Sequence, residues 1–90
     1  MEAKQIGEIL KNKLRAVSVE VEDESAAHAG HEGAQLGGGH YRITVVSDLF
    51  AGKTALERHR LVYSALEKEM GRDIHALAIK ALSPAETESE

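Results

Sequence analysis

The chain has 90 residues, of which 42% are hydrophobic and 29% are charged, and its formal net charge is -4 with the histidines neutral. This length is enough for one domain with a modest core and too short for two. The acidic balance argues against a dedicated nucleic-acid binder, which usually carries a basic excess for phosphate contacts.

The first half of the chain is predicted to form a helix and two strands. Residues 3–14 carry apolar side chains at helical spacing on one face. Residues 17–22 alternate valine with polar residues, and residues 40–47 also alternate, which predicts two half-buried strands. The stretch between them, 23–39, is rich in glycine and predicts a long flexible loop. Together these segments indicate a hairpin with an enlarged tip.

A long helix is predicted in the second half, after a connection at residues 48–53 in which Phe50 is expected to anchor into the core. Residues 54–70 have helical periodicity, and Thr54 with Glu57 three positions later is a capping-box pattern. The pattern leaves open whether this helix is broken near its beginning. Its predicted apolar stripe consists of Ala55, Leu56, His59, Val62, Tyr63, Leu66 and Met70.

Residues 73–81 (DIHALAIKA) predict a third strand, in which strict alternation places His75 on the same face as Leu77. The few charges on either face indicate a central or covered strand. We expect one domain over residues 1–82 and a disordered acidic tail over residues 83–90.

The resulting order, α-β-β-α-β, predicts an α+β fold. The hairpin makes the first two strands antiparallel, and the helix before the last strand allows the second and third strands to run parallel. The expected product is a three-stranded mixed sheet with the helices packed on one face.

The chain contains no cysteine, so no disulfide can form and no thiolate can serve as a nucleophile or metal ligand. A site for a soft metal must therefore use the five histidines, with carboxylates as a second choice. The N-terminal segment has no uninterrupted apolar run, and no stretch approaches the roughly 20 apolar residues of a membrane span. We therefore expect no signal peptide, no membrane anchor and a cytoplasmic location.

Three separated blocks of the sequence resemble the BolA family at compatible spacing. They are VEVEDESAAHAGH at residues 19–31, HYRITVVSDLFAGKTALERHRLVYSALEKEM at 40–70 and IHALAI at 74–79. The strongest local marker is RHRLVY at 58–63, and the resemblance extends over about residues 5–82. It implies a fold similar to class II KH domains, α-β-β-α(α)-β, which agrees with the order of the predicted elements.

The resemblance also implies a non-enzymatic function. BolA-like proteins pair with monothiol glutaredoxins and share a bridging [2Fe-2S] cluster, with glutathione, in iron–sulfur trafficking or iron sensing. One family ligand is the histidine that opens the last strand, here His75, and the second is a cysteine or histidine of the loop between the first two strands. This chain is similar to the histidine type, with His28, His31 and His40 as open candidates. Because the cluster needs four ligands, His75 and one of these cannot complete it alone.

Two other functions remain open. Several BolA-like proteins have been described as transcription regulators, and Lys53, Arg58 and Arg60 are candidate phosphate contacts for DNA, with both arginines expected to reach solvent. The connection before the second predicted helix, DLFAGK at residues 48–53, lacks the GxxG loop of RNA-binding KH domains. A zinc-binding or histidine-rich interaction module is the third interpretation. His59, on the apolar stripe, is expected to be a buried structural residue.

Overall fold

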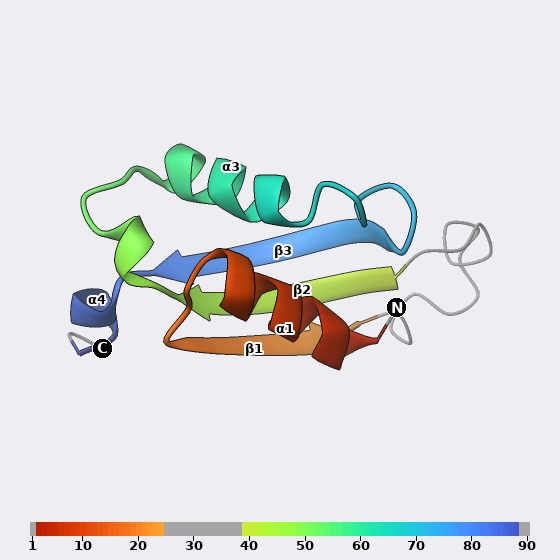
Figure 1. Cartoon of the computed structure of the whole chain (residues 1–90), viewed down its shortest axis with the longest axis horizontal. Coiled ribbons are helices and arrows are strands. Elements are labelled where there is room, and N and C mark those ends of the chain that lie inside the picture. Colours follow the sequence, from red (N-terminus) through yellow and green to blue (C-terminus); the bar gives the residue numbers. More distant parts are fainter. Residues whose placement is uncertain (1, 25–38, 89–90) are drawn as a thin grey trace.

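A three-stranded mixed sheet forms the centre of the fold (Figure 1). The computed structural model describes residues 2–24 and 39–88, and its strands are β1 (Ser18–Asp23), β2 (Gly39–Val46) and β3 (Ile74–Leu82). β1 pairs with β2 in antiparallel orientation, β2 pairs with β3 in parallel orientation, and β2 is the middle strand. This arrangement confirms the predicted α+β class and the mixed sheet.

Two helices cover one face of this sheet. α1 (Ala3–Lys13) packs on β1, and α3 (Ala55–Ala65) contacts β3 and α1. The short η2 (Asp48–Phe50) follows β2, and α4 (Pro84–Glu88) follows β3 at the same end of the sheet (Figure 1). Among the described residues, no helix is long and apolar enough to cross a membrane.

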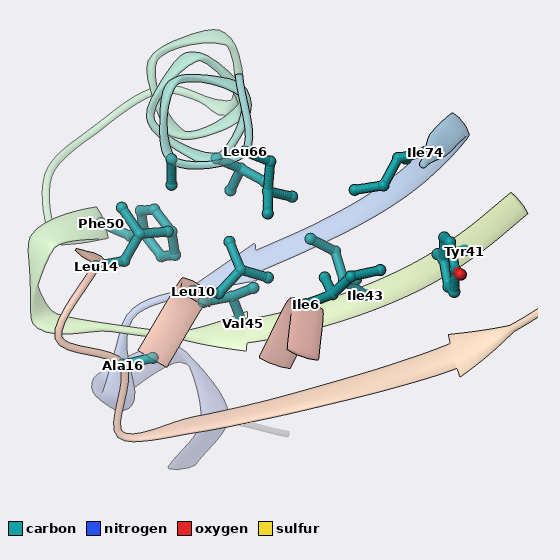
Figure 2. Close-up of a cluster of buried hydrophobic side chains, with 12 residues drawn as sticks. Ile6, Leu10, Leu14, Ala16, Tyr41, Ile43, Val45, Phe50, Leu66 and Ile74 are labelled. Atoms are coloured by element: carbon teal, nitrogen blue, oxygen red, sulfur yellow. The ribbon is translucent and has the colours of Figure 1, made fainter. Parts of the chain in front are cut away.

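The core lies between the sheet and the two helices and is mostly aliphatic. β2 turns Ile43 and Val45 toward it, because alternate residues of a strand share a face, and both are fully buried. Phe50 is also fully buried at one end of this cluster, with Tyr41 at the other end (Figure 2), which confirms the predicted anchor. The helices and the segments that follow them contribute Ile6, Leu10, Leu14, Val62, Ala65 and Leu66.

α3 begins at the predicted capping box but ends earlier than predicted. The Thr54 Oγ1 accepts a hydrogen bond from the Glu57 N–H at 3.2 Å, and the Glu57 carboxylate accepts one from the Thr54 N–H at 2.8 Å. The helix ends at Ala65 because the chain then tightens into turns, in which the N–H groups of Glu67 and Glu69 bond to carbonyls three residues back.

The face that α3 buries also differs from the prediction. Val62, Ala65 and Leu66 are buried, but Leu56 and Tyr63 are 60% and 41% exposed although the predicted stripe included them. The sheet and α1 cover only part of the predicted apolar stripe of α3, and the rest of the stripe is exposed. Periodicity indicates the apolar side of a helix, whereas tertiary packing decides how much of that side is covered.

The acidic C-terminal segment forms a short helix over part of its length. Residues 84–88 make up α4, where a disordered tail was predicted. The Glu86 carboxylate accepts hydrogen bonds from the Ser83 N–H at 2.7 Å and from the Arg58 Nη1 at 2.6 Å. The same Arg58 nitrogen donates to the Ala81 carbonyl oxygen at 3.0 Å, so the arginine ties α4 to α3 and β3.

Acidification should weaken this contact between α4 and Arg58. Hydrogen bonds from the Arg58 guanidinium and from Ser83 lower the pKa of Glu86 from 4.5 to about 2. Because the folded-state pKa is depressed, the contact stabilises the fold fully above pH 4.5 and loses its effect as the pH falls through about 2. As the pH is lowered through this range, the free energy of unfolding measured in urea should fall more for the wild type than for Glu86→Gln. The exposed Glu67→Gln variant should follow the wild type, and parallel curves for Glu86→Gln and wild type would contradict the contact.

Candidate metal centre

Two histidines lie close together where the parallel strands begin. His40 is the second residue of β2 and His75 is the second residue of β3, and both strands start at the same end of the sheet (Figure 1). The centroids of the two imidazole rings are 5.2 Å apart, and the ring planes are inclined by 42°. The structure thus brings His75 together with one of the three histidines that were candidates for the second ligand.

An irregularity in the strand pairing accompanies this contact. Gly39 pairs with Ile74 and His40 pairs with Ala76, so β3 has an extra residue, His75, opposite this step of β2. Strict alternation predicted that His75 and Leu77 share a face, and that prediction was wrong, because Leu77 packs against the core and His75 does not. The extra residue shifts the alternation of β3, so residues before the bulge point to the opposite face from the one that the alternation after it predicts. Ile74 is therefore fully buried in the core, and His75 is exposed.

An ion pair and a pocket lie beside the two histidines. The Glu24 N–H donates to the His40 carbonyl oxygen at 2.7 Å, and the Glu24 Oε2 lies 3.4 Å from the Arg42 Nε. His40 is half-buried with its Nε2 atom buried, whereas His75 is exposed, so one imidazole is held in the sheet and the other is accessible. A pocket of about 260 Å3 adjoins His40 and is lined by Glu24, His40, Tyr41, Ala76, Leu77 and Ala78.

Tyr41 and Gly39 shape the start of β2 on its core-facing side. Tyr41 is 5% exposed, and its burial, with the nearby carboxylates of Asp23 and Asp73, raises the pKa of its hydroxyl above the usual value of 10.0. A Cβ at Gly39 would overlap the Tyr41 ring and lie 2.7 Å from its Oη. Gly39 was predicted to belong to the loop, so its role beside Tyr41 was not predicted; a glycine two residues before an aromatic strand residue is the available signal.

The other two candidate ligands, His28 and His31, lie outside the described residues. Across residues 2–24 and 39–88, no group of three or more His, Cys, Asp or Glu side chains is placed to hold a metal ion. At this end of the sheet the described residues bring together two imidazoles, His40 and His75, which can fill two positions of a four-ligand site.

Known proteins similar to this chain identify its family. A family model described as BolA-like protein matches residues 10–86. The chain belongs to the BolA family. Human BolA-like protein 1 is 43% identical over 77 residues, which cover 86% of this chain and 54% of that protein. The DNA-binding transcriptional regulator BolA of Escherichia coli K12 is 39% identical over 87 residues, which cover 92% of this chain and 80% of that protein.

Larger proteins and solved structures share the same domain. SufE-like protein 1 of Arabidopsis thaliana is 42% identical over 87 residues, or 91% of this chain and 24% of that protein. The chain thus spans about a quarter of this relative and about half of the human one. The structure of the BolA domain of SufE1 from Arabidopsis thaliana matches with a TM-score of 0.79 and 43% identity over 93% of each chain. A Bol-like protein from Babesia bovis matches with a TM-score of 0.81 and 34% identity, covering 99% of this chain and 92% of that one.

The two imidazoles of this BolA-family chain fit part of an iron–sulfur site. Two rings that bind one tetrahedral metal through nitrogens at about 2.1 Å have centroids about 5 Å apart, and the observed separation is 5.2 Å. Neutral imidazole is a suitable ligand for iron, and two histidines can occupy one iron of a [2Fe-2S] cluster. Ring spacing and donor type therefore both suit a single iron atom.

The basic residues considered for DNA binding differ in accessibility. Arg58 was expected to reach solvent, but its side chain is only 12% exposed. It donates to the carbonyl oxygens of Lys53 and Ala81 and to Glu86. The expectation was wrong because the guanidinium joins the start of α3 to the end of β3. Lys53 and Arg60 are exposed.

Proposed function

We propose that this protein binds a monothiol glutaredoxin and shares a bridging [2Fe-2S] cluster with it, with His75 and His40 as its two ligands. The observation that carries the proposal is the 5.2 Å separation of the two imidazole rings. Membership of the BolA family supports the same conclusion. In this role the protein is a partner in iron–sulfur trafficking or iron sensing rather than an enzyme.

The donor set requires a second protein. A [2Fe-2S] cluster needs four ligands, and this chain, which lacks cysteine, supplies no thiolate. The remaining two ligands would be thiolates from the glutaredoxin and its glutathione. Histidine in place of thiolate on one iron raises the reduction potential of a cluster, which is the chemistry that this pairing would supply.

The chain's own residues contribute position and access. The bulge that displaces His75 from the core face leaves this imidazole exposed to an approaching partner. His40 is half-buried, and its backbone carbonyl accepts a hydrogen bond from the Glu24 N–H, so the backbone that carries this ring is paired within the sheet. A partner that carries a cluster would thus meet one exposed ligand and one half-buried ligand on a paired strand.

Titration of a [2Fe-2S]-loaded monothiol glutaredoxin with this protein, followed by visible circular dichroism, tests the proposal. A new spectrum that saturates at an equimolar ratio is expected, and His75→Ala and His40→Ala should each abolish it. His59→Ala is the matched control, since His59 lies on α3 and not at the histidine pair. His59 is half-buried, although it was predicted to be buried. An unchanged spectrum for His75→Ala would overturn the ligand assignment. Loss of the spectrum in His28→Ala or His31→Ala, but not in His40→Ala, would place the second ligand within residues 25–38.

DNA binding is the second candidate function. The Escherichia coli relative is named a DNA-binding transcriptional regulator, and Lys53 and Arg60 are exposed here. The net charge of -4 and the engagement of Arg58 by Glu86 both weaken this candidate. If loaded glutaredoxin causes no spectral change, DNA binding becomes the first function to examine.

A further inference from the structure

The outer edge of β1 carries a groove that takes no part in the histidine site. α1 and β1 form its walls, and its volume is about 340 Å3. Gly7 opens this groove, because a Cβ there would lie only 3.7 Å from the Val21 Cγ2 and 4.0 Å from the Val19 Cγ1. β1 and β3 are the opposite edges of the sheet, so the groove lies on the edge away from His75.

The backbone of β1 is oriented to accept a further strand at this groove. Within the described residues β1 pairs only with β2, which makes it an edge strand. The Glu24 N–H bonds to the His40 carbonyl oxygen across the two strands, and hydrogen-bonded positions alternate along an antiparallel pair. The N–H and C=O groups of Val19 and Val21 therefore point away from β2, and these two residues also line the groove.

We propose that an extended segment of a partner protein, with alternating apolar and basic residues, adds to β1 as a fourth strand. Side chains of an added strand alternate between the two faces of the sheet. Those on the α1 side enter the groove, where Val19 and Val21 favour apolar residues. Lys4, Glu8 and Lys11 of α1 also line the groove, and the two lysines disfavour basic residues on this side. Those on the other side lie beside Glu20 and Glu22, which are exposed, and cross-strand neighbours of opposite charge stabilise pairing.

The charge of β1 disfavours a second copy of this chain as the occupant. Antiparallel pairing of two β1 strands about Val21 would place Glu20 of each copy opposite Glu22 of the other, and like charges across strands are destabilising. Such charges also protect an edge strand from self-association. A basic partner strand turns this repulsion into attraction. The inference is independent of the proposed cluster binding, because the groove and the histidines lie on different strands.

A short synthetic peptide of alternating lysine and valine is the first probe. In a nitrogen-15 chemical-shift titration of the full chain, its largest shifts should fall on the amides of residues 18–23 and 3–11. A peptide of the same composition, with its lysines and valines in separate blocks, should bind at least about tenfold more weakly because it cannot alternate. Equal binding of the two peptides would show that net charge alone accounts for the interaction, and would overturn the proposal.

Two variants test the groove and the charges separately. Gly7→Leu fills the groove and should weaken peptide binding at least about tenfold, whereas Ser64→Leu, at an exposed position of α3, should bind like the wild type. The Glu20→Lys/Glu22→Lys variant should instead prefer an alternating glutamate–valine peptide. Far-ultraviolet circular dichroism checks that each variant folds. Unchanged binding by Gly7→Leu, or concentration-dependent dimers with protected β1 amides in the absence of peptide, would overturn the proposed occupant.

Discussion

Replacing Phe50 with alanine should lower the free energy of unfolding by about 3–5 kcal/mol, the usual cost of truncating a buried aromatic side chain. Phe50 is fully buried at one end of the core (Figure 2), and the chain has only two other aromatic residues. Small domains have a total stability of about 5–15 kcal/mol, so the loss removes much of the available free energy. We expect the variant to show an unfolded fraction at temperatures where the wild type is fully folded.

Urea unfolding followed by far-ultraviolet circular dichroism measures this effect. Leu49→Ala is the matched control, because Leu49 is the neighbouring residue in η2 and is 42% exposed. Its change should stay within about 0.5 kcal/mol, as is usual for surface substitutions. If Phe50→Ala costs no more than Leu49→Ala, the connection between β2 and α3 is not anchored in the way that the burial of Phe50 indicates.

The elements with strong local periodicity could be predicted from the sequence. α1 and the three strands lie within one residue or so of their predicted bounds, and Thr54 caps α3 as its spacing with Glu57 indicates. Phe50 was also identified as an anchor, since it is the one aromatic residue of the short connection at residues 48–53. These signals depend on neighbouring residues in the chain, so no tertiary information is needed to read them.

The features that were missed depend on contacts between distant residues. The low exposure of the Arg58 side chain could not be predicted from α3 alone, since its partner Glu86 lies 28 positions further along the chain. The same contact orders α4, which composition alone predicted to be disordered. In the candidate site, the resemblance pointed to His75, but its face was predicted wrongly. The bulge that sets this face exists only when β3 is paired with β2.

Gly39→Ala should be the most damaging single-atom addition near the histidine pair. A Cβ at Gly39 would overlap the buried Tyr41 ring, so either the ring or the start of β2 must move. Overpacking of this kind costs about 1–3 kcal/mol. Gly7→Ala is the matched control, because its added Cβ would meet Val21 at an ordinary contact distance of 3.7 Å. Alanine there should raise stability by about 0.5–1 kcal/mol, since glycine is unfavourable within a helix.

A double-mutant cycle shows whether the Tyr41 ring is the cause of that loss. The Gly39→Ala/Tyr41→Leu variant removes the overlapping ring, so its loss of stability should be smaller than the sum of the two single losses. Gly39 pairs with Ile74 at the step where β3 bulges, and a shift of this pair would move His40 relative to His75. Gly39→Ala should therefore also weaken the circular dichroism change with cluster-loaded glutaredoxin, and the double variant should recover part of it. Additive losses of stability would show that the two side chains do not compete for the same space.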